Sequence, residues 1–89
     1  MLLAWFPVLL NQMTLQEVNR LHTALLPYEN DISRLNHESD TFTVEKGQEI
    51  QDVMRRHMRG FPKTYMVKAD LRDAIAELHR RMVAATKVT

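Results

Sequence analysis

A regular hydrophobic stripe lies in the second quarter of the chain and predicts a helix. Its apolar side chains recur in alternating steps of three and four residues, which is the spacing of one helix face. The stripe consists of Val18, Leu21, Leu25, Tyr28, Ile32 and Leu35. Thr14 and Glu17 have the spacing of a capping box, in which each side chain binds the backbone amide of the other residue. We therefore expect a helix over 14–35.

Pro27 lies inside this stripe. A proline within a helix removes one backbone hydrogen bond and clashes with the preceding turn. Either the helix is kinked at Pro27, or it ends near Leu26 and a second helix begins with the proline at its first position. We favour one kinked helix, because the phase of the stripe continues beyond the proline.

Two later stretches with helical spacing predict helices over 44–59 and 67–85. The first contains Ile50, Val53, Met54, His57 and Met58. Gly60 follows it at the place where a glycine commonly ends a helix. The second contains Val67, Leu71, Ile75, Leu78 and Met82. The polar residues 36–43 predict a loop, with a short strand over 41–44 as an alternative because these four residues alternate.

The first ten residues are the most apolar stretch of the chain. Pro7 disfavours helical geometry at Phe6, so we expect an extended arm over 1–13, or at most a short turn that begins at Pro7. Ten residues fall short of the roughly 20 that a membrane-spanning helix needs. No Lys or Arg precedes Arg20, whereas a secretory signal begins with a basic region. We expect a cytoplasmic protein without a membrane partner.

This arm must pack against something, because monomers seldom expose a large apolar patch. It can pack across the chain's own helices, or on a second copy of the chain. The modest core that 89 residues allow favours a homodimer that uses the arm and the stripe. The candidate self-association residues are Trp5, Phe6, Leu9, Leu10, Val18 and Leu25.

Composition agrees with one small globular domain over 1–89. Hydrophobic residues make up 45% of the chain and charged residues 26%, with two glycines and three prolines, which excludes low-complexity and collagen-like classes. The absence of cysteine excludes a disulfide framework, a thiolate nucleophile and a cysteine zinc site. Together with the periodicity, these facts predict an all-α protein, a small three- or four-helix bundle with an apolar N-terminal arm.

The charges are distributed unevenly along the chain. Residues 29–52 hold seven acidic and two basic residues, a net charge of −5. Residues 53–89 hold nine basic and three acidic residues, a net charge of +6. The two parts can neutralise each other within the fold or across a dimer, or the basic part can face phosphates or an acidic partner.

Recognisable catalytic or ligand-binding motifs are absent from the sequence. No histidine pairs with another ligand at a metal-binding spacing, and two glycines cannot form a glycine-rich phosphate loop. The histidines are His22, His37, His57 and His79. No nucleophile motif surrounds Ser33 or Ser39. We therefore expect a protein that is not an enzyme and that binds no metal and no cofactor.

The most suggestive segment combines cations with aromatic side chains at the end of the predicted helix 44–59 and in the turn that follows it. The candidate partner-binding residues are Arg55, Arg56, Arg59, Phe61, Lys63 and Tyr65. Two helices joined by a short turn with glycine resemble a helix-turn-helix in outline. The following segment 68–73 has two acids and no Asn or Gln, so it is a poor reader of bases. We expect a small interaction or regulatory protein, an inhibitor, adaptor or assembly factor, with a protein partner. A nucleic-acid-binding transcriptional regulator is the alternative.

Overall fold

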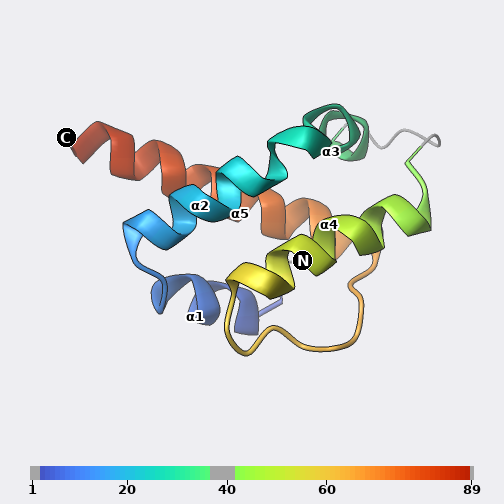
Figure 1. The fold of residues 1–89 in the computed structure, drawn as a ribbon, viewed down its shortest axis with the longest axis horizontal. Coiled ribbons are helices and arrows are strands. Elements are labelled where there is room, and N and C mark those ends of the chain that lie inside the picture. Colours follow the sequence, from blue (N-terminus) through green and yellow to red (C-terminus); the bar gives the residue numbers. More distant parts are fainter. Residues whose placement is uncertain (1–2, 37–41, 89) are drawn as a thin grey trace.

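The computed structural model describes residues 3–36 and 42–88. Within these ranges the chain forms helices and no strand, so the predicted all-α class is confirmed (Figure 1). The elements in chain order are α1 (Trp5–Asn11), α2 (Leu15–Leu25), the short 3-10 helix η1 (Leu26–Tyr28), α3 (Glu29–Asn36), α4 (Val44–His57) and α5 (Lys68–Val88).

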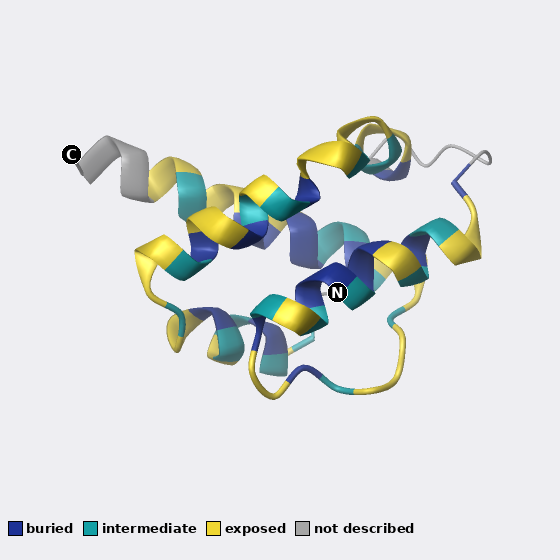
Figure 2. Ribbon diagram, in the orientation of Figure 1, coloured by how far each residue is buried: buried dark blue, intermediate teal, exposed yellow. Residues whose placement is uncertain are grey.

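Three helices form the centre of the bundle. α2 contacts both α4 and α5, and α4 and α5 contact each other. α1 and α3 pack on α5 from two sides (Figure 1). The buried residues lie where these helices face one another, and the outward surfaces are exposed (Figure 2). The largest fully buried apolar side chains are Phe6, Leu21, Ile50, Met54, Met58, Leu71 and Leu78.

The N-terminal segment is a helix, so the expectation of an extended arm was wrong. Pro7 is the third residue of α1, where its missing N–H costs nothing because the first N–H groups of a helix have no partner within it. Phe6 is fully buried and Leu10 almost so. Burying each of these side chains contributes about 1.5–3 kcal/mol, which offsets the steric cost of a helical residue before proline.

Most of the candidate self-association residues lie in the core of a single chain. Phe6, Leu10, Val18 and Leu25 are buried, and Trp5 and Leu9 pack against them. The arm therefore packs across the chain's own helices, which was the other alternative, and its residues no longer give a reason to expect a homodimer. Self-association itself stays a prediction.

Pro27 divides the region that we expected to be one kinked helix. A residue at this position would normally donate its N–H to the carbonyl of Thr23, four residues earlier, and proline cannot. The Leu26 N–H binds that carbonyl instead, which tightens the turn into η1. α3 then runs in a different direction from α2 and is seen almost end-on in Figure 1.

The region before α4 is not a strand in its described part. Thr43 caps the helix, because its hydroxyl oxygen accepts a hydrogen bond from the Lys46 N–H at 3.1 Å. Phe42 lies in the core, and Val44 already belongs to α4. Thr41, the remaining residue of the possible strand, lies outside the described residues, as does His37. α4 ends at His57, two residues earlier than expected, and Gly60 turns the chain with a φ of 83°.

The burial of Phe6 predicts that α1 is essential to the stability of the single chain. Phe6→Ala should lower the free energy of unfolding by about 3–5 kcal/mol, because it removes a large side chain from the core. Val8→Ala, in the same helix but half-exposed, should change it by less than about 0.5 kcal/mol. Urea unfolding followed by circular dichroism measures both values. Equal effects of the two substitutions would contradict the position of α1.

Candidate functional site

The structure separates the six candidate partner-binding residues into two groups. Phe61 is only 7% exposed and belongs to the core, where its ring meets that of Trp5 edge-on at 5.2 Å between centroids. Arg55 is partly buried. The exposed members are Arg56, Arg59, Lys63 and Tyr65. Phe61 is therefore not available as an anchor for a partner, which corrects the sequence-based interpretation.

Arg55 holds the loop between α4 and α5 in place. Its Nε and Nη2 atoms donate hydrogen bonds to the Pro62 carbonyl at 3.3 and 3.0 Å, and its Nη1 atom pairs with Asp52. The guanidinium also lies over the rings of Phe61 and Tyr65, at 5.3 and 5.1 Å from their centroids. Such stacking on aromatic faces stabilises a cation, so this arginine has a structural role.

Gln51 fixes the far end of the same loop, and sequence analysis missed it. Its amide nitrogen donates to the carbonyls of Gly47 and Met66, and its amide oxygen accepts the Met66 N–H at 2.6 Å. The side chain is buried, so these bonds satisfy groups that water cannot reach. The available signal was a polar residue directly beside the predicted core position Ile50. The sequence does not show that the loop folds back and brings Met66 to Gln51, because that position depends on tertiary contacts.

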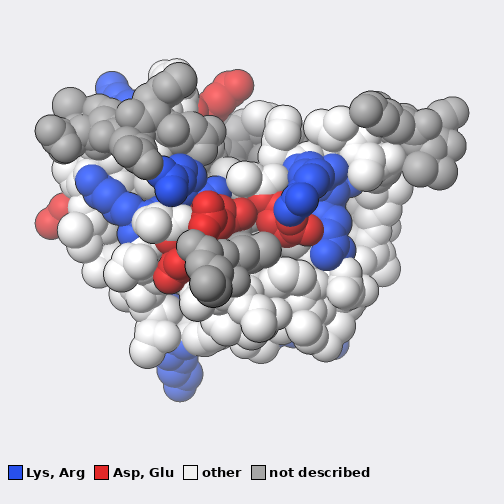
Figure 3. Space-filling model, turned by 180° about the vertical axis from the view of Figure 1, so that it is seen from behind, with Lys and Arg blue, Asp and Glu red and all other residues white. Residues whose placement is uncertain are grey.

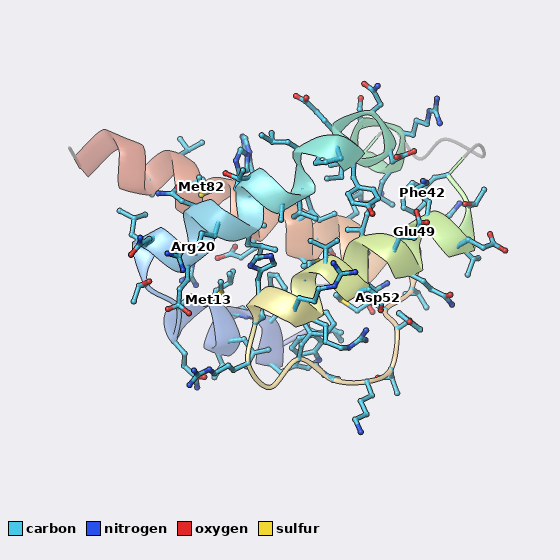
Figure 4. All side chains as sticks on the ribbon, in the orientation of Figure 1. Met13, Arg20, Phe42, Glu49, Asp52 and Met82 are labelled. Carbon is cyan, nitrogen blue, oxygen red and sulfur yellow. The ribbon has the colours of Figure 1, made fainter. Side chains whose placement is uncertain are left out.

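A small basic depression lies where the start of α2 meets the end of α4. Its volume is about 230 Å³. The lining residues are Glu17, Arg20, Arg55, Arg56, His57 and Arg59, and we call this set the basic depression. Arg20 was not a candidate in the sequence, because nothing there shows that α2 packs beside α4. Figure 4 shows Arg20 near Met13, at the end of the molecule where α1 meets α2.

Glu17, the carboxylate among the lining residues of the depression, forms a hydrogen bond within its own helix cap. The Glu17 Oε1 atom accepts the Thr14 N–H at 3.0 Å, and the Thr14 hydroxyl oxygen accepts the Glu17 N–H at 3.1 Å. The expected capping box is therefore present. The backbone hydrogen bond from Thr14 lowers the pKa of Glu17 most, the Thr14 side chain adds to this, and the positive charges of Arg59 and Arg20 contribute further.

Three arginines of the depression have no acidic partner. Among the described residues, no carboxylate lies within 4.0 Å of Arg20, Arg56 or Arg59. The carboxyl end of α4 is a favourable place for positive charge, because the carbonyls of the last turn carry a partial negative charge. The three guanidinium groups are therefore available to an anion from outside the described residues.

The opposite face of the molecule has a different pattern. Figure 3 shows acidic side chains in the middle of this face with basic ones on both sides of them. In α5, Glu77 pairs with both Arg80 and Arg81. These two arginines therefore have an acidic partner, unlike Arg20, Arg56 and Arg59 of the basic depression.

A larger hollow of about 540 Å³ is mainly apolar. It lies between α2, η1 and α3 on one side and α5 on the other. Its floor includes Leu25, Ile75 and Leu78, and His22 and His79 are among its lining residues. Within the described residues, no three His, Asp or Glu side chains are placed to bind one metal ion. No helix in the same ranges is long and apolar enough to cross a membrane.

Comparison with protein-family models, with curated proteins and with solved structures finds no match to this chain. The chemistry of the basic depression is thus the main guide to function.

Neighbouring arginines of α4 should differ sharply in their effect on stability. Arg55→Ala removes the bonds to the Pro62 carbonyl and leaves that carbonyl without its donors, which should cost about 1–3 kcal/mol of unfolding free energy. Arg56→Ala should cost less than about 0.5 kcal/mol, because Arg56 is exposed and unpaired. Urea unfolding of the two variants tests this. A larger effect at Arg56 would overturn the structural role of Arg55.

The lowered pKa of Glu17 gives stability a defined dependence on pH. The folded state favours the charged carboxylate, so this stabilisation is present above the ordinary pKa of about 4.5 and is lost as the pH falls through the lowered folded value. Glu17→Gln keeps the side-chain shape but carries no charge. The variant should be less stable than the wild type at pH 7 and should approach it at pH 3. Urea midpoints at both pH values measure the difference, and a constant gap between the two proteins would refute the assignment.

Proposed function

We propose that this chain is a small non-enzymatic binding protein that docks on an acidic protein surface through the basic depression. Inhibitors, adaptors and assembly factors work in this way. The observation that supports the proposal is the convergence of Arg20 of α2, Arg56 of α4 and Arg59, just after α4, none of which has an acidic partner among the described residues. Unpaired guanidinium groups favour carboxylates and phosphates, because their planar donors form two parallel hydrogen bonds with such groups.

The surroundings of the depression suit a protein partner. Lys63 and Tyr65 are exposed on the adjoining loop, and Tyr65 is 45% exposed. A tyrosine that keeps a hydrogen bond, here from its hydroxyl to Asp52 at 3.0 Å, is held in place and presents a rigid contact surface. Positive charge beside it would steer an acidic partner toward this surface.

Nucleic-acid binding has less support from the arrangement of the helices. A helix-turn-helix joins its helices by three or four residues, whereas ten residues separate α4 from α5. The first turns of α5 contain Asp70 and Asp73, which would repel a phosphate backbone. A nucleic-acid-binding regulator, the alternative that the sequence suggested, is therefore one possible outcome of the test below.

The proposal that the chain is not an enzyme rests on the same residues. Glu17 is bound by its own helix cap, and His57 is the other group of the depression that could move a proton. A general acid or base must be free to reach a proton of the substrate, and the hydrogen bond from the Thr14 N–H already engages the Glu17 carboxylate.

A matched pair of variants tests the docking function. Arg56→Gln with Arg59→Gln removes two charges from the depression, and Arg34→Gln with Arg80→Gln removes two charges elsewhere. Wild-type protein, immobilised, first captures binding proteins from extract of its native host. Association of the captured protein should then be on the order of tenfold slower at low salt with the first variant, and near wild type with the second.

Three results would count against docking on an acidic protein. The two variants could associate equally well, which would make the depression irrelevant. The wild-type rate could be independent of salt, which would exclude charge steering. Binding could also disappear after nuclease treatment, which would favour the nucleic-acid regulator instead.

A further inference from the structure

We infer that the basic depression binds one phosphate monoester group, presented by a phosphorylated side chain of a partner protein. This inference rests on the proposed docking function and names the group that the depression recognises. It depends on the number of available donors, on the excess charge, on the size of the depression and on the distribution of the other cations.

The number of available donors exceeds what a carboxylate can use. Arg20, Arg56 and Arg59 each offer up to five N–H donors, and none of them is paired with a described carboxylate. A carboxylate has two oxygens with about four lone-pair sites, and one guanidinium in a bidentate pair engages both oxygens. A phosphate monoester has three terminal oxygens, so it can accept from several guanidinium groups at once.

The excess charge also matches a phosphate monoester. Four arginines line the depression, of which Arg55 is neutralised by Asp52. Glu17 offsets one of the remaining three, which leaves a local excess of two positive charges. A phosphate monoester carries a charge of about −1.5 to −2 at pH 7, whereas a carboxylate carries one.

The size of the depression indicates a single group rather than a whole small molecule. Its volume of about 230 Å³ lies below the range of roughly 300–1,000 Å³ that is usual for pockets of drug-sized ligands. A phosphorylated side chain needs only its phosphate in the depression, and the rest of the partner can lie on the exposed loop beside it.

Apart from Lys63 on the adjoining loop, several of the other described cations are already engaged and do not extend the depression into a track for a nucleic acid. Arg34, Lys46 and Arg81 are each paired with an acidic residue of their own helix. Lys68 lies over the ring of Phe42. A nucleic acid presents a repeating row of singly charged diesters, and its binding needs a corresponding row of available cations.

The depression is also pre-formed by well-anchored elements. Val18 and Leu21 are buried on α2 near Arg20, and Met54 of α4 and Met58, the residue that follows α4, are buried near Arg56. Little ordering of the backbone is then required when the anion binds, which favours affinity.

Small-molecule titrations followed by two-dimensional amide NMR test the inference without an identified partner. The probes are phenyl phosphate, diphenyl phosphate and benzoate, which share the phenyl ring and present a monoester, a diester and a carboxylate. Phenyl phosphate should cause saturable shifts at residues around Arg20, Arg56 and Arg59. Its affinity should exceed those of the other two probes by about tenfold, because it has more oxygens and more charge.

Variants confirm where the probe binds. Arg20→Gln and Arg56→Gln should each weaken phenyl phosphate binding by at least about tenfold, since each removes one guanidinium from the depression. Arg34→Gln, on α3, should leave it unchanged. Urea unfolding shows whether each variant is folded, and both substituted arginines of the depression are exposed.

The results that overturn the inference are distinct from those that overturn docking. Equal affinity for all three probes, preference for diphenyl phosphate, or unchanged binding in both Arg20→Gln and Arg56→Gln would refute a monoester site. If that happens while Arg56→Gln with Arg59→Gln still slows docking, the docking function stands and only the phosphate recognition falls. Specific phosphate binding without any effect on docking would instead reject the proposed function.

Discussion

The packing of α2 against α4 is the interaction on which the rest of the structure depends. It buries Leu21 on one helix and Ile50 and Met54 on the other, each worth about 1.5–3 kcal/mol. The same packing brings Arg20 beside Arg56 and Arg59. Like charges at 4 Å in water repel by about 1 kcal/mol. Burial therefore outweighs the repulsion, and the fold holds together cations that would otherwise separate.

Successive residues of α4 have different roles because each turns the side chain by about 100° around the helix. Met54 points into the core, Arg55 faces the loop and holds the Pro62 carbonyl, and Arg56 is exposed. Gln51, one turn before Arg55, holds Met66 at the other end of that loop. One face of α4 therefore packs in the core, a second holds the loop between α4 and α5, and a third is charged and exposed. The contacts of the second face keep the loop beside the exposed charges.

The features that sequence analysis predicted well are those set by neighbours along the chain. The capping box of Thr14 and Glu17 and the helical spacings of α4 and α5 depend on residues within a few positions of each other. The features it missed depend on tertiary contacts. The helix at Pro7 forms because Phe6 finds a place in the core, and Phe61 is buried because Trp5 reaches it from a distant part of the sequence. Arg20 was missed for the same reason, because only the packing of α2 beside α4 brings it to the basic depression.

The excess charge of the basic depression arises from competition for two carboxylates. Most of the described ion pairs of α3, α4 and α5 join residues three or four positions apart, so the acidic and basic regions of the sequence are partly compensated within single helices. Glu17 lies three residues before Arg20, but the Thr14 amide engages it. Asp52 lies four residues before Arg56, but Arg55 and Tyr65 engage it. Both carboxylates thus make their short contacts in the cap of α2 and at the loop, and neither forms an ion pair with Arg20 or Arg56. The interactions that stabilise the fold are thus the ones that leave these arginines available to an external anion.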